Sequence, residues 1–247
     1  MDNTTYISLS RQNALWNQLE VVSNNLANVN TIGFKGSDVL FSEYLVKVRS
    51  DERPFKDKIA FTQDFGLVRD MTQGPLRHTN NTLDLAIQGE GYFVVEGVEG
   101  ENFTRAGNFT LDINGQIVNQ EGLPLLSTNN TPITLDASVD EITINGDGAI
   151  IVNAEEVDRI RVVNFTDPRD LQQVDGTLFR AVAGQPSIDI ERPRIAQGAL
   201  EDSNVNGVVE MTRMIALNRA YQDINNMVKT EDERKKKAAD VFTRKVA

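Results

Sequence analysis

Two apolar heptad patterns, one at each end of the chain, constrain the fold more than any other feature of the sequence. In each pattern apolar side chains recur at alternating intervals of three and four residues, which is typical of helices that pack against another helix. We expect a first helix over about residues 5–30 and a second from about residue 206 onward, where Asn206 can act as the N-cap. The N-terminal seam consists of Leu15, Leu19, Val22, Leu26 and Val29, and the C-terminal seam of Met214, Leu217, Tyr221, Ile224 and Val228.

Four asparagines gather at the end of the first helical pattern, although Asn is a poor helix former. They are Asn24, Asn25, Asn28 and Asn30. Two interpretations stay open. A buried Asn beside an apolar seam can fix helix register by hydrogen bonding across it, and Asn can equally end a helix through local turns. Gly33, just past the pattern, stands where a helix stop is expected.

The middle of the chain shows short apolar runs that alternate with turn signals, among them Asn114-Gly115 and Asn145-Gly146. Asn-Gly between β-prone runs is a strong hairpin signal. We therefore expect an α+β fold, in which the N- and C-terminal helices pair as a coiled coil and an all-β domain is inserted between them. The expected divisions are residues 1–33 (helix), 34–82 (connector), 83–195 (β domain) and 196–247 (helix). Within the connector, residues 39–48 fit helix and strand equally well.

Composition excludes several functional classes. Acidic residues outnumber basic ones by 36 to 25, which gives a net charge of −11 and argues against a nucleic-acid partner. The chain has no Cys and a single His, His78, so thiol catalysis and His-rich or Cys-rich metal centres are not expected. No apolar run is long enough for a transmembrane segment, and the N-terminus shows no cleavable signal peptide.

The sequence offers little chemistry for catalysis, and we expect neither enzyme activity, nor a cofactor, nor a metal. The closest pattern is a near-match to a calcium loop over residues 110–121, but its first position is Thr110 and its flanks are strand-like. A hairpin is the better interpretation. His78 lacks a nucleophile motif or a second His beside it, which favours a structural role for this side chain.

Four segments resemble, in the same order, motifs of the bacterial flagellar rod and hook family. They are Ser23–Lys35, Leu83–Phe93, Phe103–Phe109 and Gln197–Asn206. Three further segments are similar to the proximal rod members of that family: Leu9–Gln12, Phe41–Leu45 and Glu210–Ile215. The chain departs from the family pattern at Ser23, where Ala is usual, and at Gly207, where many relatives have Pro.

The resemblance implies a non-enzymatic structural subunit of the flagellar basal-body proximal rod, with paired terminal helices in an inner tube and the β domain outside. Its implied partners are other rod subunits, further copies of itself, and the flagellar type III export apparatus, which would deliver it uncleaved to the periplasmic rod. The implied assembly interface comprises both seams with Asn24, Asn25 and Asn28. Two alternatives remain, a distal rod or hook-type subunit and an extracellular β-domain binding module or adhesin.

Overall fold

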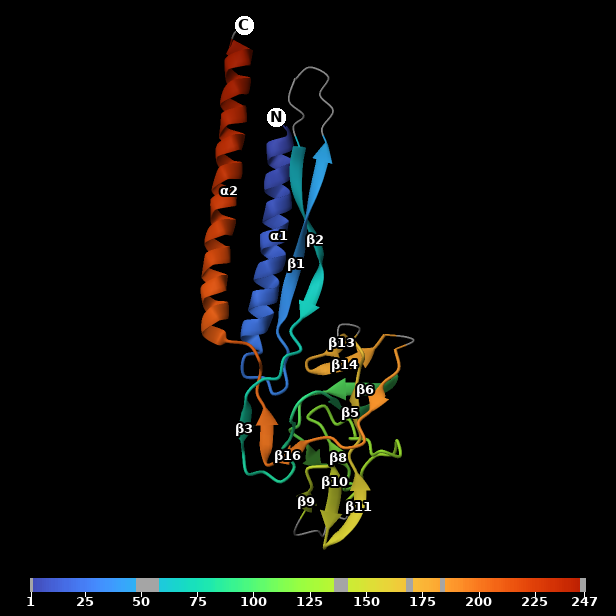
Figure 1. Cartoon of the computed structure of the whole chain (residues 1–247). Coiled ribbons are helices and arrows are strands. Elements are labelled where there is room, and N and C mark those ends of the chain that lie inside the picture. The colour runs from blue at the N-terminus through green and yellow to red at the C-terminus, as the bar shows by residue number, and fades with distance from the viewer. Residues whose placement is uncertain (1, 48–57, 136–141, 168–170, 183–184, 245–247) are drawn as a thin grey trace. The chain divides into compact units, whose positions relative to one another are not determined.

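A computed structural model of the chain describes residues 2–47, 58–135, 142–167, 171–182 and 185–244 (Figure 1). The chain divides into two compact units. The helical unit consists of Met1–Ala27, Ser37–Val68 and Asn206–Ala247, and the β unit of Asn28–Gly36 and Arg69–Val205.

The helical unit is built from two long helices and a two-stranded sheet. Its elements are α1 (Asp2–Ala27), β1 (Ser37–Lys47), β2 (Lys58–Arg69, whose last residue belongs to the β unit) and α2 (Gly207–Arg244). Within this unit α1 contacts both α2 and β1, and Figure 1 shows α1 running between α2 and the β1–β2 pair. Of the two interpretations left open for residues 39–48, strand is the one observed as far as Lys47.

Both helix ends have identifiable local causes. At the start of α2 the Asn206 side-chain oxygen accepts the N–H groups of Val208 (3.1 Å) and Val209 (3.3 Å), so the predicted N-cap is confirmed. The prediction for α1 was too long, because the helix ends at Ala27 and not near residue 30. Asn28 and Val29 therefore lie in a turn and not on the helix, since Asn28 bonds locally to Thr31 through both its backbone carbonyl and its side chain (3.1 Å each).

The β unit consists of short antiparallel strands. Its six-stranded sheet has the order β13-β14-β6-β5-β12-β15, a three-stranded sheet has the order β11-β10-β9, and β16-β4, β17-β3 and β7-β8 form pairs. The strands are β3 (Leu76–His78), β4 (Leu85–Ile87), β5 (Tyr92–Gly97), β6 (Gly100–Thr104), β7 (Thr110–Leu111), β8 (Ile117–Val118), β9 (Ile142–Ile144), β10 (Ala149–Val152), β11 (Glu155–Arg159), β12 (Val162–Asn164), β13 (Leu171–Asp175), β14 (Leu178–Ala181), β15 (Ile188–Asp189), β16 (Ile195–Gln197) and β17 (Ala199–Glu201).

Two apolar clusters form the core of the β unit. In the larger one Phe93 and Phe109 meet edge to face, with ring centroids 5.3 Å apart, among Leu, Ile and Val side chains from several strands. In the smaller one Phe165 contacts the rings of Tyr92 and Phe103. All the regular elements that the structure describes between residues 83 and 195 are strands.

The segment that nearly matches a calcium loop is a hairpin between β7 and β8, as predicted. The Asp112 carboxylate accepts the N–H groups of Gln116 (2.7 Å) and Asn114 (2.8 Å), which lowers the pKa of Asp112. Gly115 has φ +77, and a Cβ there would lie 2.1 Å from the carbonyl oxygen of Leu135. Side-chain oxygens that a calcium ion would need thus serve the turn instead.

A buried ionic cluster of Lys35, Arg105 and Glu201 lies inside the β unit, where these side chains are 0%, 5% and 1% exposed. Lys35 Nζ donates to Glu201 Oε1 and to the carbonyl oxygen of Thr72 (2.7 Å), while Arg105 reaches Glu201 Oε2 at 3.2 Å. The N–H of Gly74 adds a third donor to Glu201, at 3.0 Å. Burial lowers the pKa of Lys35, and the adjacent Glu201 opposes that effect.

Asn204 ties together three passages of the chain next to this cluster. Its side-chain oxygen accepts the N–H of Gly36 at 2.8 Å, and its amide nitrogen donates to the carbonyl oxygen of Asp70 at 2.9 Å. The N–H of Asp70 in turn donates to the carbonyl oxygen of Gly36 at 2.8 Å. Each of the three residues stands within two positions of a crossing from one unit to the other.

Candidate assembly site

The apolar seams meet inside the helical unit, but they are not equally covered. On α1, Leu15 and Val22 are buried (2% and 3% exposed), whereas Leu19 and Leu26 are half-buried. The C-terminal seam on α2 is half-buried at every one of its predicted positions, Met214, Leu217, Tyr221, Ile224 and Val228. The helix α1 therefore covers only part of the apolar surface of α2.

Polar contacts between the helices supplement the seams. Gln12 donates from its side-chain amide to the hydroxyl of Tyr221 and to Asn225 Oδ1, both at 3.1 Å. The ring of Trp16 lies 6.1 Å from that of Tyr221, centroid to centroid. Sequence reasoning missed Gln12 and Asn225, although each lies three or four residues from a seam residue and so on the same side of its helix.

Asn25 is the one member of the asparagine group that the structure buries, at 4% exposed. Its side-chain oxygen accepts the N–H of Ser37 (3.0 Å), and its amide donates to the carbonyl oxygen of Ser37 (2.9 Å). The same amide lies 3.5 Å from Glu210 Oε2 on α2. Asn25 thus bonds across elements, mainly to the first residue of β1, while Asn28 serves a local turn and Asn24 is exposed.

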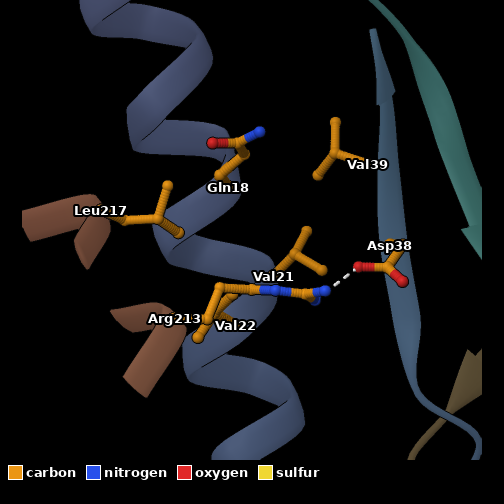
Figure 2. Close-up of a pocket in the computed structure, with 7 residues that line it drawn as sticks. All are labelled: Gln18, Val21, Val22, Asp38, Val39, Arg213 and Leu217. Carbon is orange, nitrogen blue, oxygen red and sulfur yellow. Dashed lines mark hydrogen bonds and ion pairs between the residues drawn. The ribbon is translucent and has the colours of Figure 1, made fainter. Parts of the chain in front are cut away.

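A pocket of about 360 Å³ lies between α1, β1 and α2 of the helical unit. In Figure 2, Arg213 extends from α2 past Val22 toward β1, where it pairs with Asp38 at 2.8 Å. Both partners of this ion pair are about half exposed or more (45% and 67%), so the pair stands at the rim of the pocket. The lining consists of Gln18, Val21, Val22, Asp38, Val39, Arg213 and Leu217.

The described residues include neither a candidate metal-binding group nor a candidate membrane-spanning helix. No three His, Cys, Asp or Glu side chains among them are grouped closely enough to hold a metal ion. His78 is exposed on β3, which pairs with β17. No helix in this part of the chain is both long and apolar enough to cross a membrane.

Comparison with known proteins gives three matching family models in chain order. They are "Flagella basal body rod protein" at residues 6–35, "Flagellar hook protein FlgE/F/G D1 domain" at residues 86–152, and "Flagellar basal body rod FlgEFG protein C-terminal" at residues 196–241. The chain is also 35% identical to the flagellar basal-body rod protein FlgF of Caulobacter vibrioides over 246 residues, covering 97% of this chain and 98% of that protein. The chain belongs to the flagellar rod and hook family.

Within that family the chain is a FlgF-like rod protein. It is 30% identical to FlgF of Rhizobium meliloti, with 98% of each chain covered, and 31% identical to the rod protein FlgG of Bacillus subtilis, with 94% of this chain and 96% of that protein covered. The resemblance seen in the sequence motifs is confirmed. This flagellar rod protein is a structural subunit of the basal body and assembles with other rod and hook subunits.

Proposed function

We propose that this flagellar rod protein is a non-enzymatic subunit of the proximal rod. The similarity to FlgF of Caulobacter vibrioides over nearly the whole chain supports the proximal position, since its identity of 35% exceeds the 31% of FlgG of Bacillus subtilis. On this proposal the chain reaches the periplasmic rod uncleaved through the flagellar type III export apparatus. The complete absence of Cys is compatible with such a route, because no disulfide can lock the chain before it is transported.

The terminal helices, in this proposal, pair as a coiled coil and form the element through which subunits assemble. The observation that carries it is the incomplete covering of α2: its seam is only half-buried by α1, and its outer side also exposes apolar residues. Helices of a stable lone subunit would bury these side chains, so neighbouring subunits are the natural partners. The proposed interface retains both predicted seams with Asn24 and Asn25, but Asn28 and Val29 would contribute only from the turn after α1.

A charge placed in the seam tests this function. Leu15→Asp introduces a carboxylate at a buried position between the helices, which is unfavourable by several kcal/mol. In a flagellated bacterium that lacks its own copy of the subunit, this variant should be produced but should not restore rods or swimming. Val98→Asp, at a fully exposed position of the β unit (99%), is the matched control and should restore both.

Rods assembled from Leu15→Asp at normal yield would refute the role of the helix pair. Electron microscopy of isolated basal bodies gives that result directly. Hydrogen exchange in the β unit shows whether the variant kept its fold there.

A further inference from the structure

The outer side of α2 carries a short apolar stripe that the described residues leave exposed. It consists of Val208, Met211 and Ile215, which are 75%, 54% and 55% exposed. Their spacing of three and four residues places them on one side of the helix. Further along the same side the surface turns polar, with Gln222 donating to Asn218 at 2.9 Å. We call these three residues the outer stripe.

The pocket between α1, β1 and α2 lies beside the same two turns of α2, and we call it the socket. Figure 2 shows Val21 and Leu217 between Gln18 and the Arg213–Asp38 pair, with Val39 opposite Gln18 on β1. Its volume of about 360 Å³ exceeds the roughly 150 Å³ of an apolar cavity that accepts a benzene ring. The socket therefore has room for an Ile or Met side chain.

The outer stripe and the socket lie on opposite sides of α2. Met211 precedes Arg213 by two positions, and Ile215 precedes Leu217 by two positions. Two residues correspond to about 200° around an α-helix with ~3.6 residues per turn. One copy of the chain thus presents a projecting apolar surface on one side and, on the other, a recess lined by both apolar and polar side chains, at the same level along the helix.

We propose that the outer stripe of one copy docks in the socket of a second copy, with Ile215 as the inserted side chain. This inference rests on the proposed function, and it specifies which surfaces meet. Because the two surfaces differ and face away from each other, the contact is head-to-tail, so it leaves a free stripe and a free socket after each addition. Such a contact propagates from copy to copy and does not close into a dimer.

A second copy fits the observations better than an unrelated partner. The stripe and the socket lie on the same turns of one helix, so two copies placed side by side and parallel bring them together without a shift along the axis. Three side chains also form a much smaller surface than the roughly 1,200–2,000 Å² that specific stable interfaces bury. The contact is therefore weak by itself and suits a polymer in which other contacts add to it.

Disulfide trapping tests the contact, since the chain has no Cys of its own. The double variant Ile215→Cys/Val21→Cys is expressed as the only copy of the subunit, and its basal bodies are oxidised and analysed by mass. We expect a ladder of products at whole-number multiples of the chain mass, which reduction abolishes. Each single variant, Ile215→Cys or Val21→Cys, should stay monomeric under the same oxidation.

The other outcomes contradict the proposal in distinct ways. Dimers from Ile215→Cys alone would mean that two stripes meet each other, and a product of another mass would mean that a different subunit fills the socket. Absence of cross-links, or a disulfide within one chain, in a strain that swims would exclude the docking while leaving the rod function intact.

A second experiment tests the docking independently of cross-linking. Loss of swimming in Ile215→Asp together with normal swimming in Ile215→Val would support the docking of the outer stripe in the socket.

Discussion

Replacing Glu201 by Gln tests whether the buried ionic cluster holds the β unit together. The substitution keeps the size of the side chain but removes the negative charge that faces Lys35 and Arg105, both of which are buried. Removing one partner of a buried ion pair typically costs about 3–5 kcal/mol, because the remaining charge is left uncompensated. Here two cations lose the same partner, so we expect Glu201→Gln to lower the free energy of unfolding of the β unit by at least about 3–5 kcal/mol.

The effect is large enough to measure by urea unfolding. With a urea dependence of about 2 kcal/mol per molar, a loss of 3–5 kcal/mol lowers the unfolding midpoint by about 1.5–2.5 M. Hydrogen exchange of peptides from β5 and β6 reports the unfolding of the β unit. The fluorescence of Trp16, the single Trp of the chain, follows the helical unit and should change less.

Two further variants serve as a control and as a rescue for Glu201→Gln. Asp202→Asn breaks the neighbouring Arg77–Asp202 pair, whose side chains are 54% and 34% exposed, and should cost no more than about 1 kcal/mol. Replacing all three cluster residues by Met should recover much of the loss, because no buried charge then remains unpaired. Equal midpoints for Glu201→Gln and Asp202→Asn would refute the reasoning.

Two other predictions follow from single residues. Asn206→Ala removes the cap of α2 and should destabilise its first turn by about 0.5–2 kcal/mol. Amide exchange should become faster at Val208 and Val209 but not in β5. Unchanged exchange at Val208 and Val209 would contradict the capping role. Burial raises the pKa of Tyr92 above its ordinary 10.0, so as the pH rises past that value the unfolded chain loses the phenolic proton first and the folded chain loses stability. Tyr92→Phe should remove this alkaline loss in urea titrations compared at about pH 8 and pH 11, and an identical pH dependence in both proteins would contradict it.

The parts of the fold that local sequence determines were predictable. The interval of three and four residues predicts α1 and α2, Asn206 predicts the start of α2, and Asn114-Gly115 predicts the β7–β8 hairpin. The end of α1 was not predicted, because Asn28 offers the backbone a local turn whose competition with the helix the apolar pattern does not reveal. Helix propensity and apolar periodicity depend on residues that are close together in the sequence. They predict secondary structure correctly where interactions between such residues determine it.

The ionic cluster and the socket could not be predicted in this way. Glu201 lies 166 residues from Lys35 and 96 from Arg105, and no spacing rule connects such distant positions. The socket likewise needs Val39 from a segment whose secondary structure stayed open in the sequence. For the candidate site, the seam positions on the helices were therefore available from sequence, whereas the recess beside them depends on tertiary packing.

The bonding of Asn204 has a mechanical consequence. Gly36, Asp70 and Asn204 mark three passages of one polypeptide that are hydrogen-bonded side by side. A pull on any one of these passages is then resisted by its hydrogen bonds to the others. In a structural subunit, such load sharing keeps a single backbone segment from stretching alone.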